Sequence, residues 1–401
     1  MLRSLVVVFA STLLSSVALA QIHVPGDFAD LQDAIDAASP GDVIVVHGGT
    51  FQSITIDKAL TLLGSPPPLL EPTPNGSGYL APITLAGPGS GEVVLSRIRT
   101  GGTAVGFTQS FNTAGILGGG FDELHLYDCD VHSPEWCCMT GLGTGQPGVS
   151  VTVPFVLVER SSVTGSATNI DDTMMTSGWP GPPGIDAPSS TVVVLDSSVR
   201  GGASAEFTFP SFDCGGSCPN GSGGAGVVAD VLYYSDSALD GGAAARWRDP
   251  MGNTCCSSGT VGAPFVANTA NLLGNALDAD GPPRLGSTYV LHVASGTGSR
   301  ATSPHPGPAA VLKMSNGIDA PVNVGGLGAL FLSGAPVSLG VVPAFGDVGV
   351  PLPLDLTLYG REVAFQLLGR PSGYSRPLSG VLLLPTLVAA EHADPTETRS
   401  R

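Results

Sequence analysis

IHVPGDFADLQDAIDAASPGDVIVVHGGTFQSITIDKALTLLGS, residues 22–65, is the stretch that decides the fold. Its first half carries apolar residues at helical spacing, which predicts one short amphipathic helix; these residues are Phe28, Leu31, Ile35 and Ala38. Asp27 is the predicted N-cap and Pro40-Gly41 the stop. Three apolar runs separated by turn residues follow and predict consecutive short strands at 43–46, 54–56 and 60–63.

Residues 22 to about 64 resemble the N-terminal cap and first coil of right-handed parallel β-helix proteins, which have the pectin-lyase-like fold. In that family the helix plugs the open end of the solenoid. The resemblance implies an all-β chain with a parallel β-helix and an N-terminal helical cap. It implies no particular activity, because no catalytic motif of the family is matched.

The middle of the chain contains an internal repeat, as stacked coils require. Apolar anchors recur 32, 36 and 40 residues apart, at Val131, Val163, Val199 and Leu239. Seven and five positions before each anchor the residue is again apolar, with mixed residues between, which is the period-two alternation of a strand. Weaker copies lie around Val93 to Ile98 and Leu272 to Leu277. The pattern predicts that the apolar positions face the core and the mixed ones face outward.

A polar column precedes the anchors and predicts a bend in every repeat. Three positions before the anchor stand Asp128, Arg160, Asp196 and Asp236, and one position later stand Cys129, Ser161, Ser197 and Ser237. Continued alternation would point the charged column inward, so we expect the chain to bend and shift register there. Asp suits such bends, but Asp196 and Asp236, which lack a cation between them, are also candidate Ca²⁺ ligands and candidate catalytic carboxylates.

Beyond the repeats, Gly/Pro-spaced apolar runs predict further strands. The expected division is a signal peptide at 1–20, a parallel β-helix at 21–285, a small β-sandwich-like domain at 286–390 and a disordered tail at 391–401. The first twenty residues carry one early cation, an apolar run and a small-residue end. These features predict a secreted, cell-surface or periplasmic protein with no membrane span after cleavage.

Composition and charge exclude several classes of protein. The chain has 56 Gly and 34 Pro, against 16 Lys and Arg and 33 Asp and Glu, which argues against a helical bundle. Removal of residues 1–20 takes away Arg3, so the mature net charge is 15 − 33 = −18. Such a field repels nucleic acid, and no nucleic-acid partner is expected.

Six of the seven cysteines fall in long loops that leave the repeats on one edge. They are candidates for disulfides and are Cys137, Cys138, Cys214, Cys218, Cys255 and Cys256. Six cysteines allow fifteen connectivities, so the pairing stays open. Cys129 instead occupies the inward small-residue column and is predicted to be a buried free thiol.

Aromatic residues gather in the same edge loops. Trp136, Trp179 and Trp247 each lie in one loop, and the remaining loop carries Phe207, Phe209 and Phe212. A row formed by Trp136, Trp179, Phe209 and Trp247 could stack on sugar rings and bind a polysaccharide or cell-surface glycan. Alternatively, these rings pack locally and hold the loops down.

Three functions therefore stay open from sequence alone. The leading one is a non-catalytic polysaccharide-binding or surface-display module. The second is a carbohydrate-active enzyme, either a polysaccharide lyase or a glycoside hydrolase, although the predicted outward face has one acid, Glu159, and no Arg or Lys. The third is a purely structural cell-surface protein. No cofactor is required by any motif, and Ca²⁺ is the one ion that the acidic pairs suggest.

Overall fold

The computed structural model shows a chain built mostly of β-strands, with one α-helix in its described part. The structure describes residues 21–75, 78–105, 113–137, 145–167, 180–204, 206–208, 221–248, 254–257, 259–273, 277–279, 281–293, 310–316, 318–324, 328–333, 336–342, 346–355, 358–369 and 373–383. The predicted signal peptide and the predicted tail lie outside this part. Within these ranges there is no helix with the length and hydropathy needed to cross a membrane.

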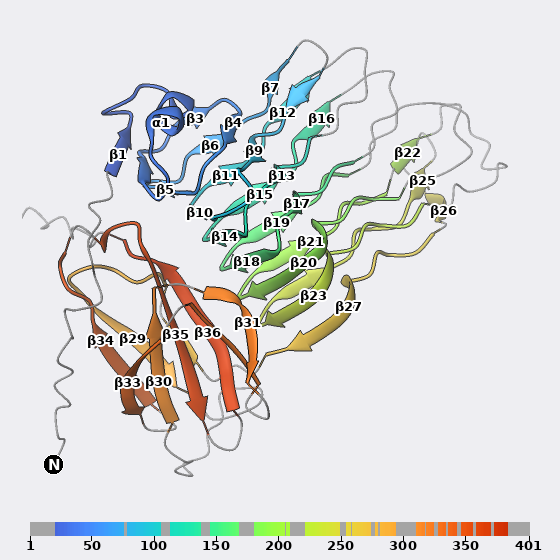
Figure 1. Ribbon diagram of the computed structural model, residues 1–401. Helices are drawn as coiled ribbons and strands as arrows, with labels where there is room; N and C mark the ends of the chain where they lie inside the picture. Colours follow the sequence, from blue (N-terminus) through green and yellow to red (C-terminus); the bar gives the residue numbers. More distant parts are fainter. Residues whose placement is uncertain are drawn as a thin grey trace, which may run out of the picture.

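The largest feature is one parallel, strongly curled sheet of 13 strands (Figure 1). One arm of this sheet contains β1 (Gln21–Val24), β2 (Val43–Val46), β5 (Leu60–Gly64), β10 (Glu92–Ser96), β14 (Glu123–Tyr127) and β18 (Phe155–Glu159). The other arm contains β4 (Ile54–Ile56), β9 (Ile83–Ala86), β13 (Ile116–Gly119) and β17 (Val149–Thr152). The arms join at three long strands, β20 (Ile185–Leu195), β23 (Val227–Ser235) and β27 (Phe265–Leu272). All three strands predicted within residues 22–65 are present.

A second parallel sheet of seven short strands follows the bends. Its strands are β3 (Thr50–Phe51), β6 (Leu69–Leu70), β11 (Arg99–Thr100), β15 (Asp130–His132), β19 (Ser162–Thr164), β21 (Ser198–Arg200) and β24 (Ala238–Asp240). The four predicted anchors are direct register partners in it, because Val131 pairs with Val163, Val163 with Val199 and Val199 with Leu239. The repeat read from the sequence is therefore confirmed at single-residue register.

Of the two weaker copies of the repeat, one lies wholly in the parallel sheet and the other only in part. The copy around Val93 is a full member of the sheet, since Val93 pairs with Leu124. The last copy continues only through Leu272, which pairs with Tyr234. Leu277 leaves the parallel sheet and begins β28 (Leu277–Ala279), which pairs antiparallel with a C-terminal strand. The repeat ends there because its second half pairs with a different sheet.

The apolar face inside the curled sheet forms one buried core that also takes in the helix α1 (Leu31–Ala37). Leu31, Ala34 and Ile35 of this helix are buried. The predicted N-cap was wrong, because Asp30 caps the helix and accepts hydrogen bonds from the backbone N–H groups of Gln32 and Asp33. Asp27 instead accepts the backbone N–H of His23 at 2.8 Å, in the turn before the helix.

The predicted bend column has left-handed backbone conformation throughout. The φ angles of Asp128, Arg160, Asp196 and Asp236 are 53°, 47°, 47° and 46°, and Arg97 continues the column at 56°. Asp adopts this region more readily than most residues because its short side chain bonds locally. The bend reverses the alternation, so the next residue and the anchor both face the core.

The small residues after the bend form a ladder of hydrogen bonds that links successive repeats. Ser161 Oγ accepts the backbone N–H of Cys129 at 3.0 Å, and Ser197 Oγ accepts that of Ser161 at 3.0 Å. Ser237 Oγ accepts the backbone N–H of Ser197 at 3.2 Å. A hydroxyl at this position thus satisfies a backbone donor that the bend removes from the strand ladder.

Cys129 heads this ladder and is a buried free cysteine with 3% of its surface exposed. Burial raises the pKa of its thiol to about 12, so almost no thiolate exists near neutral pH. We expect iodoacetamide at about pH 8 to leave Cys129 unmodified in the folded protein and to alkylate it after unfolding in urea. Mass spectrometry of the Cys129 peptide measures both states. Labelling of the folded chain, or a disulfide at Cys129 in a non-reducing peptide map, would contradict this burial.

The C-terminal part consists of antiparallel strands. It comprises β29 (Thr288–Val293), β30 (Ala310–Ser315), β31 (Ile318–Val324), β32 (Gly328–Leu332), β33 (Val337–Val342), β34 (Gly346–Pro351), β35 (Glu362–Gly369) and β36 (Gly373–Val381). They form the sheets β28-β29-β34, β33-β30-β35-β36 and β31-β32.

These C-terminal strands pack on the outer face of the first arm (Figure 1). One buried apolar cluster combines Val94, Tyr127 and Leu157 of the parallel sheet with Phe331 and Phe365 of the C-terminal part. The face predicted to point outward is therefore buried beneath the C-terminal strands. His125 and Glu159 stand at positions that the sequence pattern predicted to be exposed, yet both are 0% exposed.

Candidate functional site

The edge loops bring short extra strands together at the end of the parallel sheet remote from the C-terminal strands (Figure 1). These are β12 (Thr103–Val105), β16 (Glu135–Cys137), β22 (Glu206–Thr208), β25 (Arg246–Arg248) and β26 (Thr254–Ser257). Trp136 pairs with Ala104 in the parallel ladder of β12 and β16. Phe207 pairs with Trp247 in the parallel ladder of β22 and β25. Trp179 and Phe209 lie outside the described residues.

The disulfide candidates belong to the same loops. Cys137, Cys255 and Cys256 lie in strands of the loop edge, and Cys256 is the antiparallel register partner of Trp247. Cys138, Cys214 and Cys218 lie outside the described residues. The disulfides therefore stay predictions.

Asp196 and Asp236, the candidate Ca²⁺ ligands and catalytic acids, stand on consecutive bends. The backbone N–H of Asp196 donates to the carbonyl of Ser235 at 3.1 Å, which places the two residues side by side. Among the described residues no third His, Cys, Asp or Glu joins them in a metal-binding group. Asp128, in the same column of bends, forms an ion pair with Arg160 at 3.1 Å.

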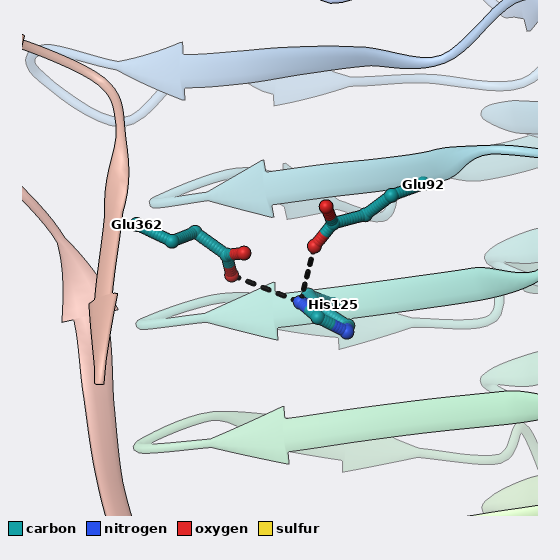
Figure 2. Close-up of side chains that lie close together, drawn as sticks. All are labelled: Glu92, His125 and Glu362. Atoms are coloured by element: carbon teal, nitrogen blue, oxygen red, sulfur yellow. Dashed lines mark hydrogen bonds and ion pairs between the residues drawn. The ribbon is translucent and has the colours of Figure 1, made fainter. Parts of the chain in front are cut away.

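A compact cluster of three glutamates and one histidine lies between the parallel sheet and the C-terminal strands. Figure 2 shows three of its members, Glu92, His125 and Glu362. Glu92 and His125 come from the neighbouring strands β10 and β14, and Glu362 reaches across from β35. His125 Nδ1 lies 2.7 Å from Glu92 Oε1 and 2.9 Å from Glu362 Oε1. His125 Nε2 lies 3.0 Å from Glu123 Oε2. Both ring nitrogens of one imidazole thus face carboxylates.

Burial and mutual charge shift every pKa in this cluster. Burial on its own would lower the pKa of His125, but the charges of Glu362 and Glu92 outweigh it and raise that pKa well above its ordinary value. Burial raises the pKa of Glu362 to about 8 against the attraction of His125. Burial on its own would raise the pKa of Glu92, but the charge of His125 and its hydrogen bond lower that pKa to about 2. Of the Glu92 and Glu362 carboxyls, Glu362 is therefore the one that takes up a proton more readily.

Aromatic rings surround the imidazole of the cluster. His125 lies edge-to-face against Phe155 with ring centroids 5.6 Å apart, and against Tyr127 at 6.1 Å. The Tyr127 hydroxyl is buried without a hydrogen bond of normal geometry, and so is Glu92 Oε1. Burial raises the pKa of Tyr127 well above its ordinary value, and the negative charges of Glu362 and Glu159 add to this rise.

A second polar network lies one repeat further along the same interface. Glu159, fully buried, accepts the backbone N–H of Ser379 at 3.1 Å and also the Ser379 hydroxyl. Arg160 Nη1 lies 2.5 Å from Glu159 Oε1 and donates to the Ser379 carbonyl at 2.9 Å. This network joins β36 to the parallel sheet and pairs the Arg160 guanidinium with the Glu159 carboxylate. Its role is therefore structural.

Sequence analysis missed Glu92, Glu123, His125 and Glu362 as a group. A signal was present in part, because the repeat aligns Glu92 with Glu123, and two like charges at paired strand positions need compensation. His125 stands two residues after Glu123 on the same strand face. Glu362 could not be found this way, since 237 residues separate it from His125.

Comparisons with known proteins add no relative. The chain matches no family model, no curated protein and no solved structure.

Proposed function

We propose that the protein is an exported right-handed parallel β-helix whose loop edge binds a polysaccharide without cleaving it, as a binding or surface-display module. The parallel ladders linking successive repeats support the β-helix. The helix α1 shares its core, which supports a role as an N-terminal cap. The antiparallel strands after residue 286 support a C-terminal β-sandwich-like domain extending to about residue 390.

The observation that carries the binding function is the parallel pairing of Phe207 with Trp247 at the loop edge. Paired residues on neighbouring strands are about 4.8 Å apart, so two aromatic residues from loops 40 residues apart in sequence stand next to each other. Aromatic residues on adjacent strands form a suitable platform for sugar rings. The net charge, −17 for the whole sequence, favours a neutral glycan, or a uronate bound through Ca²⁺.

The second candidate function is a carbohydrate-active enzyme, either a polysaccharide lyase or a glycoside hydrolase. The adjacent positions of Asp196 and Asp236 on consecutive bends favour it. In this case the two carboxylates would hold Ca²⁺ or act directly on the substrate. A purely structural cell-surface protein is the third candidate and needs neither site.

Polysaccharide retention and product formation separate these functions. The mature chain is incubated with neutral and uronate polysaccharides, with and without Ca²⁺. We expect retention without new reducing or unsaturated ends, and Trp247→Ala should weaken the affinity roughly 10-fold because a stacking ring is lost. Leu272→Ala, which removes a side chain 73% exposed on β27, should leave the affinity unchanged.

Each other outcome rejects the binding proposal. New ends would make the protein an enzyme and direct attention to Asp196 and Asp236. Absence of both retention and cleavage on every polysaccharide would leave the structural role. Equal losses in Trp247→Ala and Leu272→Ala would remove the loop edge as the binding surface.

A further inference from the structure

We propose that Glu92, His125 and Glu362 form a site for one divalent transition-metal ion, such as Zn²⁺, that ties the C-terminal strands to the parallel sheet. The three residues each offer one ligand atom, and these atoms all lie within 4.8 Å of one another (Figure 2). Two carboxylate oxygens and one imidazole nitrogen are a donor set suited to Zn²⁺. The site is far from the loop edge and independent of any glycan.

The contacts of His125 favour a metal at Nδ1. Glu123 Oε2 lies 3.0 Å from Nε2 and can accept a hydrogen bond from Nε2–H. In that tautomer the Nδ1 lone pair faces Glu92 and Glu362. A metal-binding histidine usually donates the N–H of its other ring nitrogen to a carboxylate in this way. Glu123 is therefore a positioning residue, and the ligands are the other three.

Protons alone satisfy this cluster poorly. A single Nδ1–H can donate well to one oxygen, yet Nδ1 lies 2.7 Å from Glu92 Oε1 and 2.9 Å from Glu362 Oε1. Glu92 Oε1 is accordingly buried without a hydrogen bond of normal geometry. Three carboxyl groups surround one imidazole, so the cluster is rich in oxygen atoms that can bind a cation. A divalent cation would use the Glu92 and Glu362 oxygens as ligands together with Nδ1.

A second unsatisfied group points to the same place. The Tyr127 side chain is 0% exposed, and its hydroxyl has no hydrogen bond of normal geometry although it lies near Glu362. A water completing the coordination of the metal could accept or donate the missing hydrogen bond. Tetrahedral Zn²⁺ with bonds of about 2.0–2.1 Å spaces its ligand atoms about 3.3 Å apart. His125 Nδ1, now 2.7 Å and 2.9 Å from the two carboxylate oxygens, would need to move only about half an ångström farther from each to reach that spacing.

The position of the site gives the metal a structural role. Glu92 and His125 belong to the parallel sheet, whereas Glu362 belongs to β35, and the chain between His125 and Glu362 is 237 residues long. Metal bound by all three would hold the two parts of the protein together. Bound metal disfavours separation of the two parts, and the effect grows with metal concentration. When free Zn²⁺ is a hundred times its Kd, the equilibrium constant for separation falls roughly 100-fold.

Zinc titration of the mature full chain tests the site. The protein is prepared without a polyhistidine tag, stripped with a chelator, and titrated with Zn²⁺ by calorimetry, with bound metal counted by mass spectrometry. We expect one Zn²⁺ per chain, with affinity at least 100-fold weaker in His125→Gln and in Glu362→Gln. Glu123→Gln should weaken binding 10- to 100-fold through the second nitrogen.

His292→Gln is the matched control, because His292 lies on the surface, with Nδ1 2.8 Å from the Asp347 carboxylate. It should bind Zn²⁺ as the unaltered protein does. X-ray absorption on the unaltered protein excludes binding by the cysteines and does not depend on any variant folding. Nitrogen and oxygen ligands at about 2.0–2.1 Å are expected, whereas sulfur ligands lie at about 2.3 Å. Absence of Zn²⁺ binding, sulfur ligands, or undiminished binding by His125→Gln would overturn the site.

Hydrogen exchange tests the role of the metal. Zn²⁺ should slow exchange of amides in β14 and β35 at least 10-fold in the unaltered protein, and should have no effect in Glu362→Gln. Binding of one Zn²⁺ without this protection would show that the metal does not hold the two parts together.

Discussion

Arg160→Met should lower the free energy of unfolding by about 3–5 kcal/mol, because it removes one partner of a buried ion pair. Arg160 contacts Glu159 Oε1 at 2.5 Å and Asp128 Oδ1 at 3.1 Å, and only 16% of its side chain is exposed. The Glu159 carboxylate is fully buried, so its negative charge would lose its compensation. Ser379, which also contacts this carboxylate, donates only neutral hydrogen bonds to it.

Urea unfolding followed by circular dichroism measures this effect. The surface pair of Arg99 and Asp130 provides the control, since the atoms are 3.9 Å apart and the side chains are 54% and 43% exposed. Arg99→Met should change the free energy of unfolding by about 1 kcal/mol or less, as exposed ion pairs do.

A double-mutant cycle shows whether the buried charge is the cause. Glu159→Gln keeps the shape of the side chain and removes its charge. The double variant should recover part of the loss seen in Arg160→Met, with a coupling energy of about 0.5–3 kcal/mol. Equal losses for Arg160→Met and Arg99→Met, or strictly additive effects in the cycle, would show that burial of the Glu159 charge is unimportant.

The inner half of the fold could be read from the sequence. Anchors such as Val131 and Val163 face a core that the repeats themselves form. The alternation and spacing of apolar residues are therefore enough to predict that these anchors are buried. The bend could be deduced for the same reason, because an inward Asp128 would have conflicted with that core. Its left-handed φ of 53° is the physical solution.

The outer face could not be read in the same way. His125 and Glu159 stand at positions where alternation predicts exposure, and nothing in the repeat says that another part of the chain covers them. Their burial depends on β35 and β36, which supply Glu362 and Ser379 from more than 200 residues away. Polar residues on this face therefore resembled ordinary surface residues, and the Glu92–His125–Glu362 group stayed hidden. The N-cap error at Asp27 has a local cause, since two acids stand within one turn of the helix start.

Gly242→Ala is the second change expected to have a large effect, and its cause is close packing of backbones in the glycine-rich segments that leave the repeats. The Gly242 N–H donates to the Gly224 carbonyl at 2.7 Å, and the Gly224 N–H donates to the Gly202 carbonyl at 3.0 Å. A Cβ atom at Gly242 would lie 1.8 Å from the Gly202 carbonyl oxygen and 2.4 Å from its carbon. The neighbours are backbone atoms, so no side chain can rotate away.

The added methyl must therefore displace the segments from each other and break their hydrogen bonds. We expect the free energy of unfolding to fall by at least about 3 kcal/mol, or the chain to accumulate as insoluble protein. Gly101→Ala is the matched control. A Cβ there meets only the Leu69 side chain, at an ordinary 3.8 Å. That variant should be neutral or stabilised by about 0.4–1 kcal/mol, because alanine restricts the unfolded chain.

Soluble yield and urea unfolding of both variants decide the matter. Native-like stability of Gly242→Ala would mean that the two glycine-rich segments are not packed against each other at the observed distances. The support for the loop strands β22 and β25 would then be lost, since both segments lead into them. Destabilisation of Gly242→Ala together with unchanged Gly101→Ala would instead show that glycine is required at Gly242 by contact and not by chain flexibility. The same close packing would then account for how long loops hold Phe207 and Trp247 in parallel register.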